Sequence, residues 1–348
     1  MTQTKAYAAR MQSASLENFD IERRAVGADD IQLDIDYCGV CHSDIHMVKN
    51  DWGFSIYPLV PGHEIIGRVT EVGDNVKNFK VNDRVGVGCF VDSCRRCEAC
   101  EQHLEQYCFN GMKMTYGSAT EDAGGITFGG YSKNIVVDKN YVLRIPENLD
   151  MAATAPLLCA GITTYSPLKH WNIKKGQTVG VIGLGGLGHM GVKFSHAMGA
   201  KTIMITTSPK KGVDAKALGA DDVLISTNEE AMQKWAGKFD FLLNTIPVAH
   251  DITPYISLLK FDSTMCIVGA IDEFKSLHTA QMIFGRRTIA GSLIGGIKET
   301  QEMLDFCGEH DIVSDIETIK IQDINAAYQR MEKSDVKYRF VIDMNSLT

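Results

Sequence analysis

Apolar and polar positions divide the chain into two parts with different expected structures. The segment IQLDIDY alternates as a half-buried strand does, and its predicted inner face comprises Ile31, Leu33, Ile35 and Tyr37. The segments IIGRVTEVGDNV and DRVGVGCF also indicate strands, the first of them running into a Gly-Asp turn. No long helix is expected between them, so the first third predicts a compact β-barrel-like unit.

The pattern changes near residue 150, where strands and helices begin to alternate. Strands are expected at TVGVIGLG, KTIMITT, DDVLIS, FDFLLNTI and STMCIVGA, and helices at GLGHMGVKFSHAMGA, KKGVDAKALGA, NEEAMQKWAGK and ITPYISLLK. Repeated strand–helix units predict a parallel, doubly wound sheet. The tail contains TIAGSLIGG, the helices KETQEMLDFCGEH and INAAYQRM, and the strand YRFVID, and the pattern assigns it to neither part.

Composition narrows the function classes. The 348 residues are 45% hydrophobic and 22% charged, which fits two globular domains. A net charge of −8 argues against a nucleic-acid surface. Neither a signal-peptide pattern nor a long apolar run is visible, so we expect a cytoplasmic protein without a membrane span. Ten cysteines in such a protein favour metal binding or catalysis over disulfides.

One cysteine cluster has the spacing of a structural metal site. The segment CRRCEACEQHLEQYC follows C-x2-C-x2-C-x7-C and contains Cys94, Cys97, Cys100 and Cys108. Four thiolates form a closed tetrahedral shell around zinc, which leaves no open position for catalysis. An iron–sulfur cluster is the alternative, but its shorter final gap and following proline are absent. Four incidental thiols remain the simplest alternative.

A second set of ligand-type residues is scattered along the chain. The segments YCGVCHSDIH, PGHEIIG and PLLCAGITTY contain two cysteines and a histidine of the kind that hold a catalytic zinc with one vacant position. Asp44 suits a partner of a zinc-bound histidine, or alternatively a helix N-cap. A lone buried cysteine is usually a small hydrophobe. We interpret four cysteines in that way: Cys38, Cys89, Cys266 and Cys307.

A glycine-rich turn indicates a dinucleotide cofactor. The segment VGVIGLGGLGHMGVKF places Gly183, Gly185 and Gly188 in G-x-G-x-x-G, directly after a buried strand and at the start of a helix. Such a turn lets a pyrophosphate approach the helix N-terminus. A turn that serves only packing is the alternative. Further cofactor-binding candidates are Leu184, Gly186, Leu187, Thr245, Gly269, Ser292 and Ile294.

The end of the next strand favours NADP(H) over NAD(H). An NAD site carries an acid about twenty residues after the glycines, whereas this chain reads MITTSPKK there. Hydroxyl and ammonium groups suit a 2′-phosphate that an acid would repel. The residues concerned are Thr206, Thr207, Ser208, Lys210 and Lys211. An ordinary solvated helix start is the alternative.

Together these motifs resemble the zinc-containing medium-chain dehydrogenases/reductases. CGVCHSD, PGHE, the four-cysteine lobe, LLCAGIT and GLGGLG follow that family's order over essentially the whole chain. The segments GVGCFVDSC, PLLCAGITTYSPL, GSLIGGIKETQEMLDF and KYRFVID are most similar to the cinnamyl alcohol dehydrogenase group, and within it to bacterial NADP-dependent aldehyde reductases. The resemblance implies a GroES-like β-rich catalytic domain at 1–149 and 287–348, with a zinc lobe at about 89–110. A Rossmann domain is expected at 150–286.

The resemblance also implies residue roles. Cys41, His63 and Cys159 match the catalytic zinc ligands, and Glu64 matches a residue that approaches the metal. The other matched roles are a proton relay (Ser43 and His46), cofactor contacts (His42, Thr163 and Arg339) and a substrate pocket (Trp52 and Phe90). Core packing is the alternative for the two aromatic residues.

The expected activity is reversible reduction of an aldehyde to a primary alcohol. Zinc would act as a Lewis acid on the aldehyde oxygen, NADPH would deliver hydride, and Ser43, the cofactor ribose and His46 would deliver the proton. Cinnamaldehyde, benzaldehyde and medium aliphatic aldehydes fit the expected pocket. A zinc-free quinone reductase and a zinc-stapled NADP(H) sensor are the alternatives. The family also suggests a homodimer.

Overall fold

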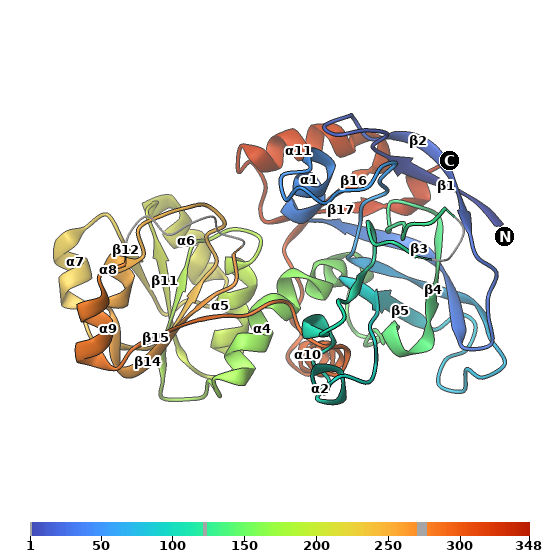
Figure 1. The fold of residues 1–348 in the computed structure, drawn as a ribbon. Helices are drawn as coiled ribbons and strands as arrows, with labels where there is room; N and C mark the ends of the chain where they lie inside the picture. The colour runs from blue at the N-terminus through green and yellow to red at the C-terminus, as the bar shows by residue number, and fades with distance from the viewer. Residues whose placement is uncertain (1, 121–123, 270–276) are drawn as a thin grey trace. The chain divides into compact units, whose positions relative to one another are not determined.

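The computed structural model describes residues 2–120, 124–269 and 277–348. The chain forms two compact units (Figure 1). The first unit contains Met1–Ile162 and Gly295–Thr348, and the second contains Thr163–Ile294. Among the described residues, none of the helices combines the length and the apolar character that crossing a membrane requires.

The first unit is built on a mainly antiparallel sheet with the order β16-β17-β3-β4-β5-β9, and β8 pairs with β3. Its strands are β3 (Asp30–Val40), β4 (Ile65–Val72), β5 (Arg84–Val87), β8 (Asn134–Asp138), β9 (Leu143–Arg144), β16 (Ile316–Lys320) and β17 (Arg339–Asp343). Two further pairs are β1 (Thr2–Ala8) with β2 (Glu17–Arg23), and β6 (Phe90–Asp92) with β7 (Lys113–Met114). Ile31, Leu33 and Ile35 of β3 are buried, as the alternation predicts.

Short helices complete the first unit. They are α1 (His42–Lys49), α2 (Glu98–Glu101), α3 (Met151–Thr154), the beginning of α4 (Ala160–His170), α10 (Ile297–His310) and α11 (Ile324–Glu332). Sequence patterning predicts α10 and α11 but not α1. Helix α1 forms because Cys41 and Asp44 make a capping box at its N-terminus.

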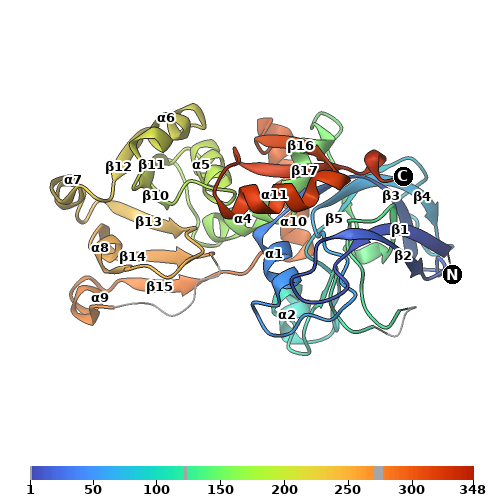
Figure 2. The same ribbon diagram turned by 90° about the horizontal axis from the view of Figure 1, so that it is seen from above.

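The second unit contains a parallel sheet of six strands among the described residues, ordered β12-β11-β10-β13-β14-β15 (Figure 2). The strands are β10 (Thr178–Ile182), β11 (Lys201–Thr206), β12 (Asp222–Ile225), β13 (Phe239–Asn244), β14 (Leu259–Ile267) and β15 (Thr288–Gly291). The helices are α5 (Gly188–Ala197), α6 (Pro209–Ala217), α7 (Glu229–Lys234), α8 (Thr253–Ile256) and α9 (Thr279–Gly285). This order is that of a doubly wound nucleotide-binding sheet and confirms the predicted fold class.

The boundaries between the units differ from the expected ones. Residues 150–162 belong to the first unit because α3 packs on β3, β4 and β17. Residues 287–294 belong to the second unit because β15 pairs with β14 there. The helix expected at ITPYISLLK is also too long: α8 ends at Ile256, since Leu259 already pairs with Phe239 in the sheet.

Candidate active site

Four ligand-type side chains from distant parts of the chain meet in the first unit. Their donor atoms lie within 4.8 Å of one another, and all four residues are buried: Cys41, His63, Glu64 and Cys159. The sulfur atoms of Cys41 and Cys159 are 3.9 Å apart, although 118 positions separate them in the sequence. Two thiolates, an imidazole and a carboxylate are donors that zinc takes in tetrahedral sites. The cluster therefore fits a zinc ion.

Local structure places each of these side chains. Cys41 is the N-cap of α1, so its side chain is fixed where β3 ends and the helix begins. His63 follows Gly62, whose φ of 102° lies in the left-handed region that favours glycine. Cys159 lies between the 3-10 turn Ala155–Leu158 and the start of α4.

Asp44 orients the imidazole of His63. Its carboxylate is fully buried, and Oδ1 lies 3.1 Å from His63 Nδ1 and accepts a hydrogen bond from Gly62 N–H at 3.1 Å. The other oxygen, Oδ2, accepts the backbone N–H of Cys41 at 2.9 Å. A proton on Nδ1 leaves Nε2 as the metal donor. Asp44 thus lies beside His63, as expected of a histidine partner. The N-cap of α1 is Cys41 and not Asp44, which is the third residue of the helix and completes the capping box.

Glu64 forms a buried ion pair with Arg339. Nη2 of Arg339 donates to Glu64 Oε1, and Arg339 is only 4% exposed. Burial raises the pKa of Glu64 to about 7, while the charge of Arg339 opposes that rise. The expected contact of Arg339 with a cofactor phosphate stays a prediction. Its guanidinium is bound to Glu64, because a buried carboxylate requires a counter-charge.

The two thiols of the cluster have opposite pKa shifts. The pKa of Cys41 lies well below its ordinary value, chiefly because the thiol of Cys159 hydrogen-bonds to it. The same contact raises the pKa of Cys159 well above its ordinary value. The cluster thus favours one thiolate by itself, and a bound divalent ion favours the second.

Helix α1 carries the expected proton-transfer residues. Ser43 Oγ lies 3.6 Å from Cys41 Sγ. His46 Nδ1 lies 2.8 Å from Asp51 Oδ2, and the His46 ring is 5.3 Å from the ring of Trp52. Trp52 is 41% exposed, so its indole is available to a ligand. His42 is exposed at the first position of the same helix.

Phe90 has a different environment from Trp52. Its side chain is only 3% exposed, and its ring meets the ring of Tyr141 edge-on at 5.9 Å. Phe90 also begins β6 and pairs with Met114 of β7. This geometry favours packing, the alternative role, over a place in a substrate pocket.

The four-cysteine cluster forms a second metal site in the first unit. The four sulfur atoms lie within 4.8 Å of one another: Cys94, Cys97, Cys100 and Cys108. The backbone amide of Phe109 donates to Cys97 Sγ at 3.4 Å, and that of Cys94 donates to Cys108 Sγ at 3.3 Å. A backbone hydrogen bond from Arg96 is the main reason that the pKa of Cys94 falls to about 6. Amides directed at sulfur favour thiolates, so the donor set fits a structural zinc.

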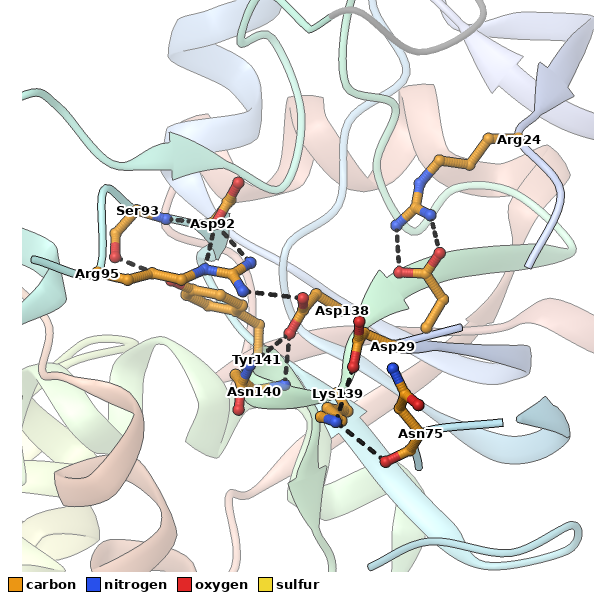
Figure 3. Close-up of polar contacts among 11 residues, drawn as sticks. Arg24, Asp29, Asn75, Asp92, Ser93, Arg95, Asp138, Lys139, Asn140 and Tyr141 are labelled. Atoms are coloured by element: carbon orange, nitrogen blue, oxygen red, sulfur yellow. Dashed lines mark hydrogen bonds and ion pairs between the residues drawn. The ribbon is translucent and has the colours of Figure 1, made fainter. Parts of the chain in front are cut away.

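A polar network attaches this lobe to the sheet (Figure 3). Arg95, between two of the cysteines, donates to Asp92 at 2.9 Å and to Asp138 at 3.0 Å, and its guanidinium lies 5.2 Å from the Tyr141 ring centre. Tyr141 OH and Ser93 Oγ are 2.8 Å apart, and Ser93 Oγ lies 3.3 Å from the sulfur of Cys100. These contacts fix the orientation of the lobe within the first unit.

The glycine turn lies between β10 and α5 in the second unit. Gly183 has a φ of 92°, and a Cβ on Gly188 would lie 1.9 Å from the carbonyl oxygen of Gly183. A Cβ on Gly185 would meet nothing within 4 Å, so the space beside it is open. Thr245 holds the turn by donating to the carbonyls of Ile182 at 2.8 Å and Gly183 at 3.0 Å. The open space beside Gly185 fits the close approach of a pyrophosphate.

The residues expected at a 2′-phosphate begin with Thr206, the last residue of β11, and continue into the start of α6. Thr206 is buried, and its Oγ1 accepts the backbone N–H of Ser208 at 3.2 Å. Thr207 and Lys210 are exposed, while Lys211 donates to the carbonyl of Leu184 in the glycine turn at 3.1 Å. No carboxylate occupies positions 206–211, so this edge of the second unit presents hydroxyl and ammonium groups.

The remaining cofactor candidates lie at several places in the second unit. Thr163 is buried in α4, and Ser292 N–H donates to the carbonyl of Ile267 at 3.2 Å. Ile294 has a φ of 36°, and Gly269 lies against the carbonyl of Ile246. Gly186 and Leu187 lie in the turn before α5.

Four residues at these sites have no role in the sequence-based prediction. The sequence offers a signal for two of them, because Arg95 lies within the cysteine motif and Asp51 lies a few residues after His46. Arg23 and Tyr131 offer no such signal, because their partners are far away in the sequence: Arg23 donates to residues 128–134, and the backbone N–H of Tyr131 donates to the Pro61 carbonyl.

Two family models match the chain. The alcohol dehydrogenase GroES-like domain matches residues 27–147, and the zinc-binding dehydrogenase model matches residues 186–309. The first match lies within the unit that holds both metal clusters. The second begins after Gly183 and Gly185 of the glycine turn and covers strands β11 to β15 of the parallel sheet.

Known proteins resemble the chain over its whole length. Aldehyde reductase YahK of Escherichia coli is 55% identical over 346 residues, which are 99% of each protein. A cinnamyl alcohol dehydrogenase of Sorghum bicolor has a similar structure, with a TM-score of 0.95 and 42% identity over 100% of this chain and 99% of its own. A Helicobacter pylori cinnamyl alcohol dehydrogenase, solved with NADP(H), has a TM-score of 0.91 and 41% sequence identity. The match covers 100% of this chain and 99% of that one. The chain therefore belongs to the zinc-binding alcohol dehydrogenase family, in the group of cinnamyl alcohol dehydrogenases and aldehyde reductases, and is an alcohol/aldehyde oxidoreductase.

Proposed function

We propose that this protein reduces aromatic and medium aliphatic aldehydes to primary alcohols, and catalyses the reverse oxidation, with NADP(H). The observation that carries the proposal is the buried cluster of Cys41, His63 and Cys159 with Asp44 behind the imidazole. A zinc-free reductase or a cofactor sensor needs no such cluster. The similar Escherichia coli protein is an aldehyde reductase, and the similar Helicobacter pylori enzyme was solved with NADP(H).

When bound, the metal supplies Lewis acidity toward a carbonyl oxygen, and the nicotinamide supplies hydride. Cys41, His63 and Cys159 hold the metal in this proposal, and Asp44 keeps the imidazole in the tautomer that serves it. Glu64, neutralised by Arg339, remains close to the donor atoms without adding a full charge. Ser43, beside Cys41, provides the hydroxyl that gives the substrate oxygen its proton. His46, with Asp51 on Nδ1, exchanges that proton with solvent.

We assign the aldehyde side chain to the surface of Trp52. An exposed indole offers apolar contact to an aromatic or aliphatic tail. Phe90 is left out of this surface because it is buried against Tyr141. The 2′-phosphate of the cofactor is assigned to the hydroxyl and ammonium groups at Thr206, Ser208 and Lys210.

The decisive experiment is an aldehyde panel run with both cofactors. Benzaldehyde, cinnamaldehyde and a C6–C8 aliphatic aldehyde are offered with NADPH or NADH, and kcat/KM is measured. We expect turnover that favours NADPH, and loss of turnover in Cys41→Ala. Near-normal turnover by Cys41→Ala contradicts the metal assignment, and a preference for NADH contradicts the cofactor assignment.

We also infer a cytoplasmic homodimer. The structure pairs none of the ten cysteines in a disulfide, and a reducing compartment keeps cysteines in that state. Strand β15 is at one edge of the parallel sheet, next to the exposed side chains of Ile283 and Phe284 on α9. A second copy can pair with such an edge and cover those apolar groups. Light scattering that gives the mass of one chain at micromolar concentration contradicts the dimer, and recovery outside the cytoplasm on fractionation contradicts the location.

A further inference from the structure

The histidine ligand lies in a segment that regular secondary structure does not fix. Residues 60–64 are neither helix nor strand and precede β4. A metal-ligating imidazole must nevertheless be held in place to within a fraction of an ångström, and the groups behind it usually provide that rigidity.

A loop from a distant part of the first unit lies along this segment. The backbone N–H of Gly129 donates to the Val60 carbonyl at 2.9 Å, and that of Gly130 donates to the Gly62 carbonyl at 2.8 Å. The backbone N–H of Tyr131 donates to the Pro61 carbonyl at 3.0 Å. Three consecutive hydrogen bonds thus hold the residues immediately before His63.

Tyr131 also reaches the carboxylate that orients the imidazole. Its fully buried hydroxyl lies 3.4 Å from Asp44 Oδ2, while Asp44 Oδ1 faces His63 Nδ1. Gly62 makes this packing possible, since a Cβ there would lie 2.7 Å from the Tyr131 ring. The loop therefore acts on the histidine from two sides, through the backbone before it and through its carboxylate partner.

The loop is held in turn by Arg23, at the end of β2. Its guanidinium donates to the carbonyls of Phe128 at 2.8 Å, Gly129 at 3.1 Å and Asn134 at 3.1 Å, and to Ser132 Oγ at 2.8 Å. The side chain is buried, and none of these four acceptors is a carboxylate. Burying a cation in this way is costly unless several hydrogen bonds compensate, so Arg23 suits a positioning role rather than surface solubility.

We propose that Arg23 is a positioning residue for the metal ligand His63, and that it acts through the loop of residues 128–134 and the hydroxyl of Tyr131. This proposal rests on the proposed metal site. Lysine cannot replace Arg23, because an ammonium group is a point charge and cannot make the same fork of hydrogen bonds. Phenylalanine at position 131 keeps the ring and removes only the hydroxyl.

The test measures release of the catalytic metal from purified holoenzyme. Zinc transfer to a chromogenic chelator is followed in Arg23→Lys and Tyr131→Phe, and Cys41→Ser identifies the phase that belongs to the catalytic site. We expect that phase to be about tenfold faster in both variants. The phase from the four-cysteine lobe should not change, which separates positioning from general destabilisation. Cobalt(II) at the catalytic site should also show a shifted visible spectrum.

Two matched variants serve as controls. Arg24→Lys changes the neighbouring arginine, whose guanidinium donates to Asp30 Oδ1 at 2.8 Å. Tyr141→Phe removes a buried hydroxyl that contacts Ser93 instead of Asp44. Both should release the catalytic metal at the wild-type rate.

The outcomes separate this proposal from the proposed function. Wild-type release and an unchanged cobalt spectrum in both Arg23→Lys and Tyr131→Phe overturn the positioning role. Tyr131→Phe alone decides if Arg23→Lys is not recovered folded. If the wild-type protein carries zinc only in the four-cysteine lobe, the proposed function fails instead.

Discussion

At the scale of single residues, the space around two glycines differs within the glycine turn. Gly188 has no room for a methyl group, because a Cβ would lie 1.9 Å from the carbonyl oxygen of Gly183. Gly185 has room on the protein side, where a Cβ meets nothing within 4 Å. We therefore propose that Gly188 is needed for the fold and Gly185 for the approach of the cofactor, although both belong to the same motif.

Alanine substitutions should separate these two roles. Gly188→Ala is expected to cost about 1–3 kcal/mol of stability through overpacking, visible as a lower Tm. Gly185→Ala should keep the wild-type Tm but weaken NADPH binding about tenfold, or ~1.4 kcal/mol, because the methyl group occupies the ligand's space. Differential scanning fluorimetry and NADPH fluorescence titration measure the two effects. Equal NADPH affinity in Gly185→Ala and wild type would contradict the assignment.

The ammonium group of Lys210 offers a test of cofactor choice. This exposed residue follows the N-cap Ser208 of α6, whereas Lys211 also contacts the glycine turn. Lys210→Ala should raise KM for NADPH about tenfold and leave KM for NADH unchanged, since only NADPH carries the 2′-phosphate. Steady-state kinetics with both cofactors is the measurement. A parallel rise in both KM values would mean that Lys210 contacts a group common to both cofactors.

At the scale of elements, the four-cysteine lobe caps a helix. Glu105 of the lobe accepts the backbone N–H of Ile297, the first residue of α10, at 3.1 Å. A carboxylate at a helix N-terminus satisfies a free amide and opposes the positive end of the helix dipole. The lobe therefore stabilises the helix with which the chain re-enters the first unit.

Removing this carboxylate should destabilise the protein modestly. Glu105→Ala is expected to cost about 0.5–2 kcal/mol, the usual range for a lost N-terminal cap. Glu101→Ala, an exposed position in the same lobe, is the matched control and should have little effect. Urea denaturation followed by circular dichroism compares the two. If the two variants have the same midpoint, Glu105 contributes nothing as a cap.

The hydrophobic pattern predicted some helices and strands better than others. The strands of the second unit follow the sequence closely because buried parallel strands are continuous apolar runs. Helix α1 escapes prediction because a capping box, not an apolar stripe, starts it. Strand β15 was expected in the catalytic domain, but its pairing with β14 places it in the second unit.

At the scale of the whole molecule, the chain holds two metal clusters with different surroundings. The four-cysteine cluster lies in a loop region attached by Arg95 and Tyr141. The second cluster brings together residues that directly precede three elements of the first unit: Cys41 before α1, His63 and Glu64 before β4, and Cys159 before α4. The first cluster should therefore support stability and the second should support turnover.

Metal counting separates these contributions. Wild-type protein should carry two zinc ions per chain, and Cys97→Ser and Cys41→Ala should each carry one. Cys97→Ser should lose several degrees of Tm, because a structural zinc contributes folding energy directly. Cys41→Ala should keep a Tm near that of wild type while losing turnover. Elemental analysis and calorimetry test this pattern, and an unchanged Tm in Cys97→Ser would contradict the structural role.

The sequence by itself determined the features that depend on neighbouring residues. Three such features are local patterns and can be predicted from the sequence: the four-cysteine spacing, the glycine turn and the strand–helix alternation. The sequence likewise shows that no acidic residue follows the strand after the glycine turn. The cofactor preference can therefore be proposed before the fold is known.

Only the tertiary structure decided which distant side chains meet. It brought Cys41 to Cys159, bound Arg339 to Glu64 and buried Phe90 against Tyr141. It also placed the Tyr131 hydroxyl beside Asp44, and Arg23 against the loop that carries Tyr131. These contacts depend on how sheets and loops pack, and residue identities along the chain carry no direct record of that packing. The boundaries between the units also depend on packing and not on composition. Helix packing places residues 150–162 in the first unit, and strand pairing places residues 287–294 in the second.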